Sequence, residues 1–160
     1  MIIDGKDWKD RLREDFSFMD PEKIEKETTY RKWGFECSGG WYELLRDCCE
    51  KIRERYEKEG LPVDFVPVQI KEKFGVLRFY YEYRDAPLTV FAIDSLEGSG
   101  VRFAPGTEDS DEDTRRLRED IARFIHEAEE KSAHVCEFCG AEGERRKDLR
   151  WIKTLCGEHY

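Results

Sequence analysis

Two short cysteine-containing segments near the end of the chain constrain its fold more than any other feature. Residues 136–140 read C-E-F-C-G and residues 156–159 read C-G-E-H, so each segment holds two ligand-type residues separated by two others. Zinc prefers thiolate and imidazole ligands in a tetrahedron, and paired ligands with this gap are typical of zinc sites. The spacing therefore predicts a zinc site made of Cys136, Cys139, Cys156 and His159.

The predicted zinc site is structural rather than catalytic. Four protein ligands fill a tetrahedral shell and leave no open position for water or substrate. Metal binding would supply folding energy that a segment as short as 134–160 cannot obtain from its own core. Gly140 and Gly157 fit the tight turns expected beside the ligands. His134 is an alternative ligand in place of His159, although it lies outside the paired spacing.

The cysteines also bear on the compartment. An even number, six here, suggests disulfides in a small secreted protein. The start of the chain has no apolar stretch of signal-peptide length, and no run approaches the roughly eighteen apolar residues of a membrane-spanning helix. We therefore predict a cytoplasmic protein with no membrane association. Because 41% of the residues are charged and 13% are aromatic, we expect a folded chain with a heavily solvated surface.

Hydrophobic periodicity predicts four helices. Apolar residues recur every four positions over 8–16, and Asp20-Pro21 indicates the start of a short helix over about 21–28. The clearest helix is 41–59, whose apolar face includes Cys48 and Cys49 as small core residues. A fourth apolar stripe predicts a helix over about 112–132, with Ser110 and Asp113 at its capping start.

A period of two predicts the strands. Alternation over 66–70 and again over 77–83, with Gly75 in the turn between them, indicates a β-hairpin. Pro67 indicates an edge strand or a position near a strand start. Further short strands are expected at 89–93 and 101–103.

These elements predict an α+β fold, in which amphipathic helices pack on a small antiparallel sheet. The C-terminal pair of metal-binding segments resembles a zinc ribbon, with 151–155 as a short strand between them. We predict an α+β domain over 1–133 and a zinc-binding segment over 134–160. The acidic run 108–113 is expected to be a solvated, mobile surface loop leading into the last helix.

The order of several motifs resembles a group of small uncharacterised proteins encoded by phages and bacteria. The motifs are GWYELL at 40–45, QIKEKFGVLRFY at 69–80, and then the C-x-x-C-G and C-x-x-H segments. The resemblance covers roughly residues 33–83 and 120–160, and implies that a segment of about 85–110 is an insertion. It implies a phage or mobile-element setting and no particular chemistry.

Three functions compete, and the first is binding to another protein. The chain holds 28 Lys and Arg against 37 Asp and Glu, so its formal net charge is −9. Such a surface would steer the chain toward basic partners, as expected of an inhibitor, an immunity protein or an adaptor. Exposed aromatic side chains would anchor the contact, although each is also a candidate for the core: Trp33, Phe35, Tyr80, Tyr83 and Trp151.

The second function is nucleic-acid binding. Residues 131–160 hold six Lys and Arg against five Asp and Glu, a formal +1, whereas the first 130 residues carry −10. Basic residues interleave with aromatics in the hairpin 71–78 and the loop 145–153, where they would contact phosphates and stack on bases. The candidate partner-binding residues are Lys71, Lys73, Arg78, Tyr80, Arg145, Arg146, Lys147, Arg150 and Trp151. Ordinary solvated charge explains the same residues without a partner.

The third function is catalysis by Cys37 or Ser38, in a glycine-rich loop just before a helix. A helix N-terminus lowers the pKa of a thiol and offers amides to an oxyanion. A nucleophile also needs a base, and only His126 and His134 are free of the predicted zinc site. Neither lies near Cys37 in the sequence, so we predict that the protein is not an enzyme.

Overall fold

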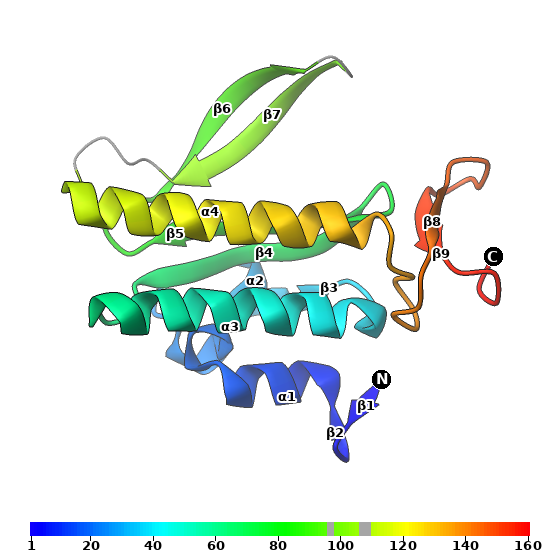
Figure 1. The fold of residues 1–160 in the computed structure, drawn as a ribbon, viewed down its shortest axis with the longest axis horizontal. Helices are drawn as coiled ribbons and strands as arrows, with labels where there is room; N and C mark the ends of the chain where they lie inside the picture. The colour runs from blue at the N-terminus through cyan, green and yellow to red at the C-terminus, as the bar shows by residue number, and fades with distance from the viewer. Residues whose placement is uncertain (96–97, 106–109) are drawn as a thin grey trace.

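The computed structural model describes the backbone of residues 1–95, 98–105 and 110–160, and the side chains of these residues outside 88–104. It has the predicted α+β fold, in which α3 and α4 lie side by side and α4 runs along β5 (Figure 1). The elements are β1 (Ile2–Ile3), β2 (Lys6–Asp7), α1 (Trp8–Asp15), α2 (Thr29–Trp33), β3 (Phe35–Glu36), α3 (Tyr42–Glu59), β4 (Phe65–Lys73), β5 (Val76–Tyr83), β6 (Leu88–Ser95), β7 (Gly98–Pro105), α4 (Glu112–Ser132), β8 (Glu144–Arg146) and β9 (Lys153–Leu155), with 3-10 turns at Ser17–Met19, Pro21–Lys23 and Gly39–Trp41.

Local sequence signals place most helix ends. Asp7 accepts the backbone N–H of Lys9 at the start of α1, and Gly60 ends α3 in the left-handed conformation with φ +66°. Asp111 caps α4 by accepting the N–H of Thr114, so the expected capping start at Ser110 and Asp113 is shifted. Asp111, the residue before Glu112, has the extended backbone conformation that an N-cap needs.

The predicted helix over 21–28 is wrong. Asp20 does begin a turn there, since it accepts the N–H of Glu22, but the turn is a single 3-10 turn. No apolar stripe follows Pro21, so a longer helix would have no apolar face to pack against the core, and the turn does not extend. A separate short helix, α2, begins at Thr29 with Thr28 as its N-cap.

The main sheet has the strand order β3-β4-β5, and β4 and β5 form the predicted antiparallel hairpin. The two-residue β3 pairs with β4 in parallel, so the sheet is mixed rather than wholly antiparallel. β4 is therefore a central strand at Ile70 and Lys71, whereas Pro67 lies beyond the reach of β3 at a register shift. A proline is tolerated there because no ladder hydrogen bond is required of its nitrogen.

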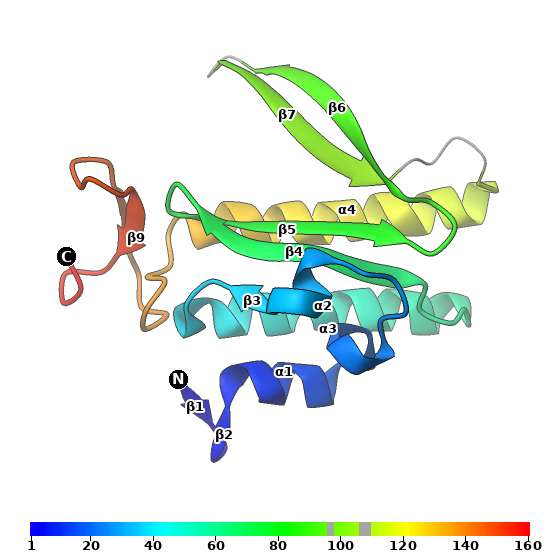
Figure 2. The same cartoon turned by 180° about the vertical axis from the view of Figure 1, so that it is seen from behind.

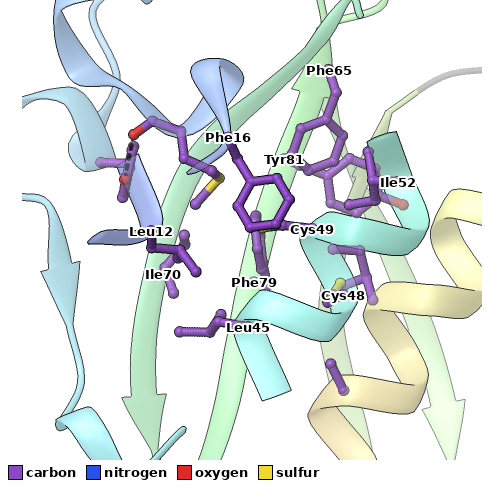
Figure 3. Packing of buried hydrophobic residues seen from close by; sticks show 14 of the residues in the cluster. Leu12, Phe16, Leu45, Cys48, Cys49, Ile52, Phe65, Ile70, Phe79 and Tyr81 are labelled. Atoms are coloured by element: carbon purple, nitrogen blue, oxygen red, sulfur yellow. Dashed lines mark hydrogen bonds between the residues drawn. The ribbon is translucent and has the colours of Figure 1, made fainter. Parts of the chain in front are cut away.

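The core lies between α1, α3, α4 and the sheet. Leu12 of α1 and Phe16, the residue after α1, cluster with Leu45 and Cys49 of α3 and Phe79 of β5 (Figure 3). Cys48 and Cys49 are both buried, as the helical periodicity predicted. Each fully buried large side chain contributes about 2 kcal/mol from the apolar surface it removes from water.

Strands β6 and β7 form an antiparallel hairpin that projects away from the helices (Figure 1 and Figure 2). These strands include the strands predicted at 89–93 and 101–103. The hairpin over 88–105 thus occupies most of the segment 85–110 that was expected to be an insertion. The hairpin is a separate two-stranded sheet rather than a continuation of the main one. The predicted acidic loop 108–113 falls partly on residues 106–109, which lie outside the described residues, and Glu112 and Asp113 form the first turn of α4.

Within the described ranges, no helix combines the length and the apolar character needed to cross a membrane.

Candidate metal centre

The structure brings together the four side chains that the spacing predicted as zinc ligands. The Sγ atoms of Cys136, Cys139 and Cys156 and a ring nitrogen of His159 all lie within 4.8 Å of one another. His159 Nδ1 is 3.1 Å from the sulfur of Cys156 and 3.6 Å from that of Cys136, and the sulfurs of Cys139 and Cys156 are 3.6 Å apart. Three sulfurs and one nitrogen at these separations form a cluster of the size and composition that a tetrahedral metal ion requires.

Two tight turns hold the ligands in place. The N–H of Gly140 donates to the carbonyl of Cys136 at 2.9 Å, and Gly140 has φ +82°, a conformation that favours glycine. The second turn closes with a bond from the N–H of His159 to the carbonyl of Cys156. Gly157 lies in this tight turn, as expected, but without a left-handed φ and with open space around it, so the turn does not depend on a glycine there.

The short sheet β8-β9 joins the two ligand pairs. Glu144 pairs with Leu155, which places Cys156 directly after the paired strand. The N–H of Cys136 donates to the carbonyl of Ala141, and this bond closes the first turn beside the sheet. The predicted strand over 151–155 is thus present as its last three residues.

The three thiols differ in pKa because of their surroundings. Burial raises the pKa of Cys136, but the backbone N–H groups of Cys139, Cys156 and Phe138 outweigh it, and the net shift is downward. Burial also raises the pKa of Cys156, but the N–H of Glu158 and the thiol of Cys139 stabilise its thiolate, and the net shift of the pKa is downward. The pKa of Cys139 is raised, since the N–H of Ala141 lowers it less than burial and the two neighbouring sulfurs raise it. A cation among the sulfurs would remove this mutual repulsion, so the donor set fits a divalent metal.

His134 is not part of the cluster. Its side chain is exposed, and its carbonyl accepts the N–H of Gly143 as the chain enters the first turn. The four clustered residues therefore make up the candidate site, in which every tetrahedral position has a protein ligand.

The metal-binding segment is docked on the start of α3 through Gly40, a contact that the sequence analysis missed. The N–H of Gly40 donates to the carbonyl of Glu137 at 2.9 Å, and the indole N–H of Trp41 donates to the carbonyl of Val135 at 2.9 Å. A Cβ on Gly40 would lie 2.2 Å from the carbonyl oxygen of Cys136. Only glycine permits this approach, because a contact that close requires the backbone itself to move.

Glu137, between two ligands, is buried beneath the same interface. Its carboxylate pairs with Lys153 of β9, and its second oxygen has no hydrogen-bond partner. Burial raises the pKa of this carboxyl, and Lys153 opposes that shift. The backbone N–H of Glu137 donates to the carbonyl of Thr154, so this residue ties the first ligand turn to β9.

The predicted partner-binding residues of the main hairpin lie in both of its strands near the tip, Lys71 and Lys73 in β4 and Arg78 and Tyr80 in β5. Lys73 lies over the ring of Phe74, 5.6 Å from its centroid, and Lys71 lies 5.5 Å from the ring centroid of Tyr80. Arg78 approaches Glu129 of α4 at 3.8 Å, so its charge is partly used within the fold.

The predicted basic residues of the C-terminal segment divide into two groups. Arg145 donates to the carbonyl of Phe74, and Arg146 pairs with Glu144 and stacks on Tyr160 at 4.2 Å from its centroid. The exposed side chains lie in the loop that connects β8 to β9, and they are Lys147, Arg150 and Trp151. The structure thus joins the basic loop to the hairpin tip through Arg145.

The candidate aromatic anchors also divide. Trp33 and Trp151 are exposed at 66% and 74%, whereas Phe35 and Tyr83 belong to the core and Tyr80 is half-buried. Phe74 is 61% exposed and was missed as an anchor. Its place before a turn glycine was the available signal.

Cys37 lies close to the metal-binding segment without being part of the metal cluster. Burial raises the pKa of its thiol to about 12, and Lys9 lowers it less than burial and the carboxylates of Glu137, Glu36 and Glu72 raise it. This direction is opposite to the one that activates a nucleophilic cysteine.

Comparisons with protein-family models, curated proteins and solved structures find no match for this chain.

Proposed function

We propose that this chain is a zinc-stabilised module that binds another protein and does no chemistry of its own. Its contact surface is the hairpin tip with the basic side chains beside it, here called the tip surface: Lys71, Lys73, Phe74 and Tyr80. The zinc ion, held by the four clustered ligands, would serve the fold, because a closed tetrahedral shell offers no position to a substrate.

The conformation of Phe74 is the observation that carries this proposal. Phe74 and Gly75 both have positive φ, +54° and +77°, in the two-residue turn between β4 and β5. Such turns favour Asn-Gly or Gly-Gly, and a bulky residue in the left-handed region costs on the order of 1 kcal/mol. An aromatic residue that keeps a strained backbone conformation while its ring is exposed has its best explanation in a partner that receives the ring.

The tip surface also has the character of an interface anchor. Aromatic side chains with nearby cations dominate many protein interfaces, since they bury a large area with few rotatable bonds. The carbonyl of Phe74 is held by Arg145, so the turn is fixed before a partner arrives. A preorganised anchor loses less conformational freedom on binding than a mobile one.

The surroundings of Cys37 support a role without catalysis. A thiol whose pKa lies near 12 is almost wholly protonated at neutral pH, and a protonated thiol is a weak nucleophile. The motif order described above adds the expectation of a phage or mobile-element setting, where an inhibitor, immunity protein or adaptor would act by binding.

The test compares two exposed aromatic residues. Tagged wild-type, Phe74→Ala and Trp33→Ala proteins would be used to isolate partners from the native host. Trp33 is a matched control because it is equally exposed and also has a lysine, Lys32, 5.0 Å from its ring centroid. We expect a protein that the wild type and Trp33→Ala retain and Phe74→Ala loses by at least about tenfold. Equal retention by all three proteins would contradict the proposal.

Nucleic acid is the second candidate, and the distribution of charge favours it. Residues 71–80 and 143–153 together hold eight Lys and Arg against three Asp and Glu, a formal +5. The remaining residues hold 20 against 34, a formal −14. Because Arg145 donates to the carbonyl of Phe74, these two basic segments lie next to each other.

Several of these cations are already engaged, which ranks nucleic acid second. Arg78, Arg146 and Lys153 each pair with a carboxylate, and exposed Glu144 and Asp148 interrupt the loop. Binding of a fluorescent 20-nucleotide single strand would decide the matter, because phosphate contacts weaken steeply with salt. Binding that survives near-physiological salt and falls in Lys147→Glu and Arg150→Glu proteins would move this candidate to first place.

A further inference from the structure

A continuous chain of contacts connects the metal ligands to the exposed turn at Phe74. Glu137, the residue after the first ligand, donates its N–H to the carbonyl of Thr154 at 3.0 Å. Thr154, two residues before the third ligand, donates its hydroxyl to the carbonyl of Gly75 at 2.5 Å. The carbonyl of Gly75 is thus bonded directly to Thr154, in the strand that leads to the third ligand. Through Thr154 it is also connected to Glu137 in the first ligand turn.

Arg145 of β8 makes a second connection to the same turn. Its Nε and Nη2 atoms donate to the carbonyl of Phe74 at 3.2 and 2.9 Å. The two donors of a planar guanidinium fix the direction of that carbonyl, and hence the peptide plane that follows Phe74. Both carbonyls of the turn are therefore held by residues of the C-terminal segment.

The fit between the turn and β9 leaves no spare room. A Cβ on Gly75 would lie 3.0 Å from the carbonyl carbon of Lys153 and 3.1 Å from the nitrogen of Thr154. Gly75 is buried although it belongs to a hairpin turn. The position of β9 therefore determines which conformations the turn can adopt.

The C-terminal segment has little apolar material with which to order itself. Its own buried cluster consists of Cys136, Leu155 and Cys156, with Leu149 packed against them, and two of these four are metal ligands. A segment with so small an apolar cluster depends on bound metal for folding energy that its own core cannot supply. The placement of β8 and β9 is therefore expected to depend on the metal.

The hairpin itself has support that needs no metal. Glu72 accepts the N–H of Gly75 at 2.6 Å, and Lys73 pairs with Val76 in the strand ladder. Loss of the C-terminal contacts would leave β4 and β5 paired and would release only the turn from its fixed conformation.

From these contacts we propose that zinc binding fixes the conformation of Phe74, so that the metal site regulates the tip surface. Zinc orders β8 and β9, and Arg145 and Thr154 then hold the two carbonyls of the turn. Because coupling between two sites is reciprocal, a partner that binds the fixed turn would also tighten zinc binding. The biological meaning of this coupling rests on the proposed function, whereas the coupling itself is a property of the chain alone.

The experiment reads the turn directly in the full-length protein without a partner. 4-Fluorophenylalanine is placed at position 74, and the fluorine spectrum is recorded with zinc and after removal of zinc by EDTA. We expect one sharp line with zinc and a shifted or exchange-broadened line without it. Hydrogen exchange is followed in parallel, and residues 72–76 should exchange about tenfold faster without zinc while the central β4–β5 ladder keeps its protection.

Substitutions at Thr154 separate this coupling from a general effect of the metal. Thr154→Val removes the hydroxyl donor at nearly constant volume, and it should keep one zinc per chain while giving the metal-free fluorine spectrum. Thr154→Ser keeps the donor and should retain the zinc-loaded spectrum. Since Thr154 is buried, Arg145→Gln provides a second, more exposed variant with the same expected result.

Two outcomes would overturn the proposal. One is an unchanged fluorine line and unchanged exchange at 72–76 when zinc is removed. The other is the zinc-loaded spectrum in both Thr154→Val and Arg145→Gln proteins. Either result leaves the binding test with Phe74→Ala unaffected, and failure of that binding test leaves the zinc coupling unaffected.

Discussion

The hydroxyl oxygen of Ser132, in the last turn of α4, accepts the backbone N–H of Leu77 in β5 at 2.8 Å. One turn earlier, the carboxylate of Glu129 accepts the N–H of Phe79 at 2.9 Å. Both N–H groups lie on the edge of β5 that has no neighbouring strand in the main sheet. Two side chains of a helix thus satisfy a strand edge that would otherwise be an unpaired, buried row of donors.

Replacement of Ser132 by alanine should therefore destabilise the fold. The variant leaves the N–H of Leu77 buried without its acceptor, which costs about 1–3 kcal/mol. Urea unfolding of the zinc-loaded protein measures the loss as a lower transition midpoint. The control is Lys131→Ala, which changes an exposed side chain in the same turn and should leave the midpoint almost unchanged. Equal midpoints for both variants would show that the edge contact has no energetic weight.

Gly40→Ala should displace the metal-binding segment from α3. The new Cβ would meet the carbonyl oxygen of Cys136 at 2.2 Å, and neither backbone can shift without breaking the bond from Gly40 to Glu137. We expect a loss of at least about 2 kcal/mol in unfolding free energy. The tryptophan emission should also change, because Trp41 donates its indole N–H to the carbonyl of Val135.

Gly157→Ala is the matched control for that change. Gly157 lies between two metal ligands, but a Cβ there meets nothing within 4 Å. The control should unfold like the wild type, within about 0.5 kcal/mol, and bind the same amount of zinc. A large loss in the control, or none in Gly40→Ala, would contradict the proposed docking.

Metal analysis of the purified protein should find one zinc ion per chain. Cys136→Ser should lose the metal, because a hydroxyl is a poor zinc ligand in place of a thiolate. The C-terminal segment should then exchange its amides rapidly, while α3 and the β4–β5 hairpin keep theirs. Cys37→Ser changes a cysteine outside the cluster and should retain one zinc. A fully folded wild-type protein that contains no metal would refute the zinc assignment.

The buried charge of Arg118 joins α4 to the residues that flank β4 and β5. It pairs with Asp64 at 3.2 Å and with Asp85 at 2.6 Å, and its guanidinium lies 4.1 Å from the centroid of the Tyr83 ring. Arg118→Met keeps the apolar stem but removes the charge beside Asp64, which should cost about 2 kcal/mol in unfolding free energy. The exposed Arg116→Met should cost less than about 0.5 kcal/mol, and similar thermal midpoints for the two variants would contradict this prediction.

The pKa of Cys37 predicts slow alkylation. With a pKa of about 12, roughly one thiol in ten thousand is ionised at pH 8, and the reactive fraction should rise about tenfold per pH unit below that pKa. Iodoacetamide labelling of the zinc-loaded protein, read by mass spectrometry of the peptide that contains Cys37, measures this rate. Fast labelling at pH 7 would show a low pKa and would revive a nucleophilic role for this residue.

Local patterns account for what the sequence by itself determined. The ligand set Cys136, Cys139, Cys156 and His159 follows from two-residue gaps that one turn can satisfy. The helix α3 and the β4–β5 hairpin follow from periodicities of 3.6 and 2, which act over a few residues. A short stretch with weaker periodicity, such as 21–28, has no comparable signal and was predicted wrongly.

Only the tertiary structure decided the contacts between distant segments. Gly40 lies against Glu137, Phe74 against Arg145, and Ser132 against Leu77, pairs that are separated by 97, 71 and 55 residues. No local pattern marks such pairs, because a glycine that permits a close approach and a glycine in an ordinary turn have the same sequence signal. The sequence thus determined which residues could hold a metal, whereas the packing of the C-terminal segment on the rest of the chain decided that Arg145 meets the carbonyl of Phe74 in an exposed turn.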